Sequence, residues 1–331
     1  MPDVDAALRT RPYRPRLYGE PTVNAGLLEY IRQWMGPDCP ADFEIDLTHG
    51  AVDAIDRLLC AYLVAGDKVA VENPCFIGII NILRTLGMQA LGVSVDAEGM
   101  RADELEEALR KGARAVILTP RAHHPTGCSL SAERARALSQ VLARHSDVLV
   151  IVDDHFALLS RREYHSVIPA DAARWALVRS FSKALGPDIR VAALVSDART
   201  SRQLRLRLAP GISWVSHLLQ DLVEAGATRP ESIELMALAR EDYARRRHML
   251  EQALREEGIS FLAGGDGLNL WIPLQTDDQA VSLALAQRGW LVRHGSSLSV
   301  QGSIRGLRIT ISNLEPAQCA PLARDIRRSL A

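Results

Sequence analysis

The residues best suited to chemistry lie together in one short segment. Residues 180–190 read Ser-Phe-Ser-Lys-Ala-Leu-Gly-Pro-Asp-Ile-Arg and separate two apolar runs, 175–179 and 191–195. Hydroxyl groups and a guanidinium can bind a phosphate, and an amine can form a Schiff base with a carbonyl group. The segment therefore predicts a site for a phosphorylated carbonyl compound, formed by Ser180, Ser182, Lys183 and Arg190.

The scarcity of lysine singles out Lys183. Only three lysines, Lys68, Lys111 and Lys183, stand against 36 arginines in the 39 basic residues of the chain. Lys68 follows the turn Gly66-Asp67 and Lys111 precedes Gly112, so both indicate solvated charges. Lys183 lies between apolar runs, where desolvation lowers the pKa of an amine and makes it nucleophilic. A lysine that simply faces solvent is the alternative interpretation.

Other suitable groups follow other expected strands. In an open α/β sheet, ligands bind beyond the carboxyl ends of the strands. Ala51 and Val52 begin a helix whose free N–H groups can hold a phosphate. Phe76 can stack on an aromatic ring, and Asp153 can pair with a protonated ring nitrogen. Singly, a strand-end Asp is more often a helix cap and a Phe more often core, but their order along the chain suits a pyridine aldehyde phosphate.

Alternating strand and helix signals must position these residues. Apolar strand-like runs occur at residues 44–47, 68–72, 89–95, 114–119 and 148–153, and amphipathic helical runs at 51–64, 76–86, 102–110 and 132–145. Strands separated by helices of this length predict a mostly parallel sheet covered by helices on both faces. Helical spacing at residues 27–35 precedes the first strand.

The pattern changes after residue 195. Helical signals fill 198–208, 213–226 and 231–257, and short strand candidates follow at 260–263, 268–274, 290–293 and 307–311, with helices at 277–288 and 315–330. We therefore expect an α/β fold with a large domain, whose mostly parallel sheet is sandwiched by helices, and a smaller α+β domain. The expected division is an N-terminal arm and part of the small domain at 1–39, the large cofactor-binding domain at 40–230 and the small C-terminal domain at 231–331.

Composition excludes several classes of function. A formal charge of −1 and a pI near 6.8 give no support for nucleic-acid contacts by this chain. Five scattered cysteines without a CxxC pair favour a reducing cytoplasm, and no apolar run reaches the ~18 residues of a membrane span. His123, His124, Asp153 and His155 could be imagined as metal ligands, but they lack HxH or HxxxH spacing, and we expect no metal.

Three motifs resemble the fold type I family of pyridoxal-phosphate (PLP) enzymes, the aminotransferase class I/II group. Residues 125–127, Pro-Thr-Gly, resemble the end of its Asn-Pro-x-Asn-Pro-Thr-Gly loop. Ser180-x-Ser182-Lys183 followed by Arg190 resembles its lysine motif, and residues 306–312 resemble its carboxylate-binding arginine segment. Within the group, the segments 46–55, 118–123, 153–159 and 214–220 look most like the effector domains of MocR-type, PtsJ-like regulators.

The resemblance implies a role for each residue. Lys183 would form the Schiff base and then shuttle a proton, Asp153 would keep the pyridine ring protonated, and Phe76 would stack on the ring. Arg308 would bind the α-carboxylate of an amino acid or 2-oxo acid. The phosphate would be held by Ala51, Val52, Ser180, Ser182 and Arg190, with Tyr18 reaching the phosphate of a partner subunit in a homodimer.

Two departures from the family pattern bear on turnover. His124 replaces the asparagine that donates to the phenolic oxygen of the cofactor. The expected tyrosine is replaced by His155 if the MocR-like spacing applies, and by Phe156 if the other common spacing applies. Only 17 residues precede Tyr18, and nothing there resembles the winged-helix domain of MocR-type regulators. The resemblance implies an aminotransferase that moves an amino group between an amino acid and a 2-oxo acid. The alternative is a PLP-sensing effector domain with little or no turnover.

Overall fold

The computed structural model describes residues 16–211, 213–302 and 304–330. Residues 1–15 of the predicted N-terminal arm lie outside the described residues. An eight-stranded sheet organises the larger part of the chain, in the order β1-β8-β7-β6-β5-β2-β3-β4. Its strands are β1 (Glu44–Thr48), β2 (Lys68–Asn73), β3 (Gln89–Asp96), β4 (Gly99–Met100), β5 (Ala113–Leu118), β6 (Leu149–Asp153), β7 (Trp175–Ser180) and β8 (Ala192–Ser196).

The sheet is mostly parallel, as the sequence predicts. Strands β3, β2, β5, β6 and β7 pair in parallel, whereas β8 runs antiparallel to both β7 and β1, and β4 antiparallel to β3. The two-residue strand β4 is too short to leave a periodic signal, and it was not predicted.

Both faces of the sheet are buried in separate apolar cores. Along β6, Leu149 and Ile151 belong to one core, and Val150 and Val152 belong to the other. Because successive side chains of a strand point to opposite faces, an apolar run such as this one must be covered on both sides. Helices α3 (Ala51–Tyr62), α4 (Ile77–Thr85) and α8 (Ala198–Leu208) contribute to the first core, and α2 (Ala25–Met35), α5 (Ala102–Arg110) and α6 (Ala132–Ala143) contribute to the second.

A second, three-stranded sheet forms the C-terminal part of the chain. Its order is β10-β11-β9 and both pairings are antiparallel, with β9 (Asn269–Pro273), β10 (Arg293–His294) and β11 (Gly306–Thr310). Helices α11 (Asp278–Ala286) and α12 (Pro316–Leu330) pack around a third core that includes Leu250, Ile272 and Ile309. The expected α/β architecture with a smaller α+β unit is therefore confirmed.

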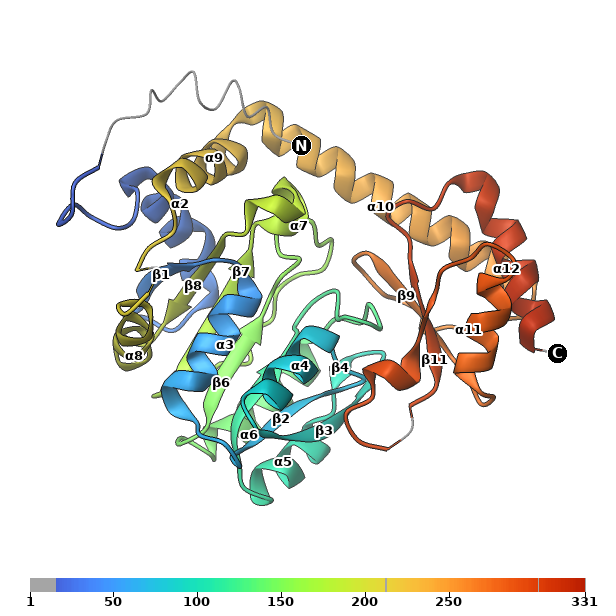
Figure 1. The fold of residues 1–331 in the computed structure, drawn as a ribbon, viewed down its shortest axis with the longest axis horizontal. Coiled ribbons are helices and arrows are strands. Elements are labelled where there is room, and N and C mark those ends of the chain that lie inside the picture. Colours follow the sequence, from blue (N-terminus) through green and yellow to red (C-terminus); the bar gives the residue numbers. More distant parts are fainter. Residues whose placement is uncertain (1–15, 212, 303, 331) are drawn as a thin grey trace.

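One long helix joins the two sheets. After α9 (His217–Thr228), α10 (Pro230–Glu256) extends from the region of the larger sheet to the smaller one (Figure 1). The expected strand at 260–263 was wrong. That segment lies between Gly258 and Gly264, both with positive φ, and its N–H at Leu262 donates to the carbonyl oxygen of Trp271 in β9 without extending into a strand. Among the described residues, none of the helices combines the length and apolar character needed to cross a bilayer.

The segment that carries Lys183 returns the chain from β7 to its antiparallel neighbour β8. It contains a single helical turn, α7 (Ser182–Leu185), and a 3-10 turn from Pro187 to Ile189. Phe181 is fully buried and its N–H donates to the carbonyl oxygen of Val191, which closes the base of the segment. The segment therefore lies at the carboxyl end of β7. The carboxyl ends of the strands parallel to β7 lie at this same edge of the sheet.

Candidate functional site

Gly50 and Arg190 bring the start of α3 against the Lys183 segment. Gly50 has a φ of 96°, and a Cβ atom there would lie 2.9 Å from Nη2 of Arg190, so a side chain would displace the guanidinium. Ala51 and Val52 form the first turn of α3, where N–H groups lack partners within the helix. A guanidinium beside a helix N-terminus is a suitable site for an anion.

Two serines add hydroxyl groups to this anion site. The N–H of Ser182 donates to Oγ of Ser180 at 3.2 Å, and Ser180 is buried at the end of β7. Oγ of Ser182 is buried and has no hydrogen-bond partner. Since a buried hydroxyl is costly to leave unpaired, Ser182 retains a hydroxyl group for a ligand. The other predicted phosphate residues, Ala51, Val52, Ser180 and Arg190, lie at the start of α3 and along the same segment.

Asp153 ends β6 with one carboxylate oxygen unpartnered. Its Oδ1 is buried without a hydrogen bond, and its Oδ2 lies 3.9 Å from Nδ1 of His155. Burial raises the pKa of Asp153 to about 7, and the charges of Asp154 and Glu72 add to the shift. A carboxyl group in this state is suited to pair with a cationic partner that the chain itself does not supply.

Lys183 is close enough to Asp153 and His155 for its charge to act on both. Burial lowers the pKa of His155 to about 4, and the positive charge of Lys183 contributes to that shift, so the imidazole is neutral at pH 7. Lys183 itself is exposed, which differs from the enclosed position expected from its apolar flanks. The reason is that Lys183 lies on the outer side of α7, a single turn, whereas Leu185 of the same turn is buried.

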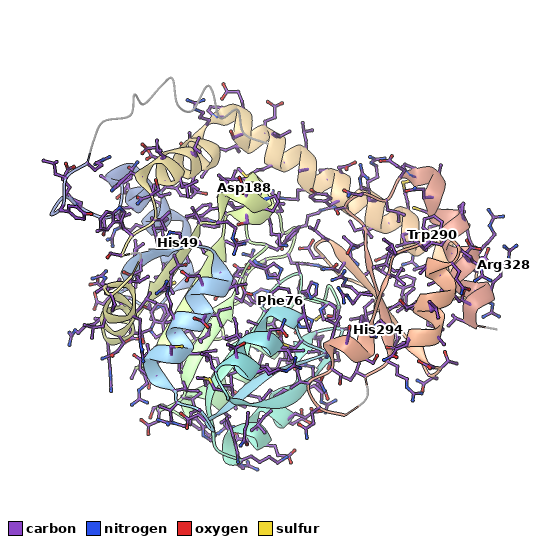
Figure 2. The ribbon with its side chains drawn as sticks, viewed as in Figure 1. His49, Phe76, Asp188, Trp290, His294 and Arg328 are labelled. Atoms are coloured by element: carbon purple, nitrogen blue, oxygen red, sulfur yellow. The ribbon has the colours of Figure 1, made fainter. Side chains whose placement is uncertain are left out.

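His124 and Arg308 form a direct contact between the two parts of the chain. Nη1 of Arg308, in β11, donates to Nε2 of His124 at 2.9 Å. Burial, followed by the charge of Arg308, lowers the pKa of His124 to about 2, so the ring is a neutral acceptor. Its ring also packs edge-on against Phe76, with centroids 5.0 Å apart, and Figure 2 shows Phe76 near the middle of the molecule at the start of α4.

Tyr18 stands apart from the other predicted site residues. Its side chain is 95% exposed, and its ring packs edge-on against Trp214 at 5.9 Å. This position on the surface is the one expected of a residue that acts on another subunit, but that role stays a prediction.

A buried histidine beside the site was missed as a site residue. Nε2 of His123 lies 3.2 Å from Oε2 of Glu72, and its Nδ1 is 2.7 Å from Oγ1 of Thr126. Burial alone would lower the pKa of His123, but the attraction of Glu72 outweighs it and raises the pKa to about 10. The clue in the sequence to this buried ion pair was Glu72, a carboxylate within the otherwise apolar strand β2. Across the described residues, no three His, Cys, Asp or Glu side chains are arranged to hold a metal ion.

A network of buried arginines was also missed. Asp154 receives hydrogen bonds from Nε and Nη2 of Arg121 at 3.0 and 2.6 Å, and from Nε of Arg179 at 2.8 Å. Arg179 also donates to Asp38 at 2.5 Å and lies over the rings of Trp34 and Tyr164. The available clue in the sequence was again a charged residue, Arg179, next to the last position of the otherwise apolar strand β7.

Comparison with known proteins agrees with this geometry. The profile for aminotransferase class I and II matches residues 13–326. The chain belongs to this family. It is 51% identical, over its whole length, to the vitamin B6 salvage pathway transcriptional repressor PtsJ of Salmonella typhimurium, of which it covers 76%.

More distant relatives include both regulators and enzymes. An uncharacterised HTH-type transcriptional regulator of Escherichia coli, YdcR, is 30% identical over 73% of this chain, which spans 53% of that regulator. The kynurenine aminotransferase of Pyrococcus horikoshii, solved in complex with PMP, superposes with a TM-score of 0.88 over 99% of this chain and 85% of its own, at 19% identity. At that identity the likeness shows the fold, which is that of fold type I aminotransferases.

Proposed function

We propose that this chain binds PLP through Lys183 and acts as the cofactor-responsive effector module of a MocR-type regulator. The fit of the site to PLP rests on groups that the chain leaves unused. Oδ1 of Asp153 and Oγ of Ser182 are buried without hydrogen bonds, and Gly50 keeps the space beside Arg190 clear. These are the partners that a ring nitrogen and a phosphate require.

Each part of the cofactor is assigned to different residues of the site. When bound, PLP supplies an aldehyde that reacts with amines and a pyridine ring that withdraws electrons. Lys183 would supply the amine, and Asp153 would keep the ring nitrogen protonated. Phe76 would pack against the ring, and His124 and His155 would offer imidazole N–H groups to its oxygen. The phosphate would be bound by Ala51, Val52, Ser180, Ser182 and Arg190.

The observation that carries the sensing role is the contact of His124 with Arg308. The arginine proposed to bind a substrate carboxylate already donates Nη1 to a neutral imidazole at 2.9 Å. A substrate carboxylate therefore competes with His124 for part of the guanidinium. Identity of 51% to a transcriptional repressor over the whole chain supports the same proposal.

Aminotransferase activity is the second candidate. Lys183, Asp153 and Arg308 together form the minimum set for moving an amino group from an amino acid to a 2-oxo acid, with Lys183 as the proton carrier and Arg308 as the carboxylate ligand. The family to which the chain belongs is named for this reaction. The two candidates share the cofactor and differ in whether the chain turns over an amino acid.

One experiment separates the candidates. The purified protein is loaded with PLP, and the absorbance of the bound cofactor is followed as each of a panel of amino acids is added. We expect the yellow colour to persist in the wild type and to be lost at least about tenfold faster in His124→Asn, because Arg308 is released. Keto acid formation by the wild type would establish turnover and remove the purely sensing role.

Attachment to Lys183 has its own control. We expect borohydride to fix the cofactor to the wild-type peptide that contains Lys183, and Lys183→Ala to remain colourless with an unchanged circular dichroism spectrum. A yellow Lys183→Ala variant would contradict the assignment of the lysine, and with it both candidate functions.

The remaining context is also proposed. Tyr18 is exposed beside Trp214, which supports a homodimer in which it reaches the phosphate of the partner; sedimentation showing only monomers would remove that role.

All five cysteines are free, which supports a reducing, cytoplasmic location. The division of the chain at residues 39/40 and 230/231 stays a proposal, although α10 begins at Pro230.

A further inference from the structure

A second cavity lies away from the Lys183 site. It has a volume of about 640 Å³ and opens between α10, the loop that follows β6 and the glycine-rich turn at residues 264–267. None of Lys183, Asp153, Arg190 and Arg308 lines it. The volume falls within the ~300–1,000 Å³ range of pockets that bind small molecules.

The lining of this cavity is rich in arginine. Arg161 and Arg162 come from the loop after β6, and Arg240, Arg245 and Arg247 come from α10. The carboxylates in the lining are already engaged. Glu241 pairs with Arg161, Glu251 lies near Arg247 and Arg255, and Asp266 accepts from the hydroxyl of Ser160. Asp242, outside the lining, pairs with Arg245. The lining itself holds five arginines against three carboxylates, which leaves an excess of positive charge.

Arg247 is the decisive side chain because it is buried and incompletely satisfied. The residue is only 6% exposed, and its Nη2 donates to the carbonyl oxygens of Asp266 and Asn269. Its Nε and Nη1 are buried without hydrogen bonds, and the nearest carboxylate oxygen, in Glu251, lies 3.8 Å from Nη1. A buried guanidinium with two unpaired N–H groups is costly unless a ligand accepts from them.

Two neighbours direct further donors to the same place. Arg240 donates Nη2 to the carbonyl oxygen of Leu158, and its Nε is buried without a partner. A Cβ atom at Gly265 would lie 2.8 Å from Nη1 of Arg247, so a side chain at this position would displace the guanidinium. Three guanidinium nitrogens without hydrogen-bond partners thus belong to two residues that line one cavity.

From this arrangement we propose that the cavity binds a small phosphorylated or otherwise multiply charged oxyanion, at a site separate from the one proposed for PLP. Guanidinium groups match the geometry of phosphate and carboxylate oxygens and bind them with strong, charge-assisted hydrogen bonds. Arg247 and Arg240 donate to the ligand in the interior. Arg162 is exposed at the entrance, where it donates to the carbonyl oxygen of Gly264.

The floor of the cavity is continuous with the loop that carries His124. The N–H of Asp266 donates to the carbonyl oxygen of Gly127 at 2.7 Å. A Cβ atom at Gly127 would lie 2.9 Å from Nη2 of Arg247, so this loop and the arginine pack directly on each other. An anion bound by Arg247 therefore lies one layer of residues from the His124 loop.

The test is calorimetric titration of the purified chain at constant ionic strength. The parent for all measurements carries Arg190→Gln, which weakens anion binding at the proposed PLP site. Inorganic phosphate and glycerol 3-phosphate are the probes, since they distinguish a free anion from a phosphate ester, and glycerol is the uncharged comparison. We expect saturable binding of at least one phosphate compound and none of glycerol.

Variants locate the binding. We expect Arg247→Gln to weaken it about tenfold or more and Arg240→Gln by about threefold to tenfold, the loss of one charge-assisted interaction each. Arg202→Gln, which removes the same charge from the exposed face of α8, is the matched control and should leave binding unchanged. If Arg247→Gln fails to fold, the Arg240→Gln measurement decides alone. Absence of saturable binding in the parent, or equal weakening by Arg202→Gln, would overturn the proposal.

Discussion

Two neighbouring aspartates at the end of β6 show how the same residue type serves two purposes. Asp154 is fully buried and receives three hydrogen bonds from Arg121 and Arg179. Asp153 lies on the opposite side of the chain, and its Oδ1 has no hydrogen bond at all. The two residues are adjacent in the chain, so the difference between them arises from their surroundings. Arginine donors surround the carboxylate of Asp154 but do not reach Oδ1 of Asp153.

The pKa values of the two carboxyl groups move in opposite directions. Burial opposes ionisation of both, but the charges of Arg179 and Arg121 lower the pKa of Asp154, whereas burial and two neighbouring carboxylates raise the pKa of Asp153 to about 7. A buried carboxylate that is hydrogen-bonded to arginines of the chain contributes to the fold. A buried carboxylate without such partners is available to a ligand. Isosteric substitution of each aspartate tests this distinction.

Asp154→Asn should have the largest effect on stability. Loss of this charge leaves Arg121 and Arg179 buried without their shared partner, and breaking a buried ion pair in this way costs roughly 3–5 kcal/mol. Urea unfolding at pH 7, followed by circular dichroism, would measure the change in the free energy of unfolding. A loss below about 1 kcal/mol would mean that Asp38 and the aromatic rings suffice for the arginines.

His123→Gln should have an intermediate and pH-dependent effect. The pKa of His123 is raised to about 10 by Glu72 against the effect of burial, so its charged form stabilises the fold below the unfolded pKa near 6.5. That contribution, about 1–3 kcal/mol, is then lost progressively as the pH rises from 6.5 through 10. The wild type should therefore be more stable than the variant at pH 6, and the difference should shrink by pH 9.5.

A solvent-exposed histidine provides the control for this measurement. His248→Gln, on the exposed side of α10, should give the same difference from the wild type at both pH values. A His123→Gln deficit that stayed constant between pH 6 and 9.5 would show that packing, rather than the ion pair with Glu72, accounts for the role of His123.

The sequence was sufficient for the elements that carry the site. The predicted strand at 148–153 ends where β6 ends, because its apolar run stops at the first of two aspartates. Lys183 was placed correctly between two strands because β7 and β8 are buried on both faces, and such strands appear as continuous apolar runs. Local pattern and strand polarity therefore determine where functional groups emerge from the sheet.

The partners of those groups could not be predicted from the sequence. Arg179 and Asp154 are 25 positions apart, and Arg308 and His124 are 184 positions apart. Each contact depends on strand order, register and the placement of the smaller sheet, none of which leaves a periodic signal. For that reason the sequence indicated that Asp153 and Asp154 were polar strand ends but did not indicate which of them was already paired.

Asp153→Asn should have the smallest effect on stability, and of the opposite sign. Because the folded pKa of about 7 exceeds the unfolded value near 3.8, the native state holds its proton more tightly, and ionisation of Asp153 destabilises the fold as the pH rises from 4 to 7. Asparagine is neutral at every pH and removes this penalty. The variant should match the wild type near pH 3, below both pKa values, and equal or exceed its stability at pH 8 by up to about 1 kcal/mol.

The pair of variants then gives the sharpest form of the comparison. Urea unfolding of Asp153→Asn and Asp154→Asn at both pH values keeps side-chain volume constant, so only the charge and its partners differ. If Asp153→Asn lost as much stability as Asp154→Asn, Asp153 would be part of the structural network, and its unpaired Oδ1 would no longer support a binding role. A stable Asp153→Asn variant that bound PLP weakly would show that this carboxylate serves ligand binding. In that case the substitution would reduce the affinity for PLP without reducing the stability of the fold.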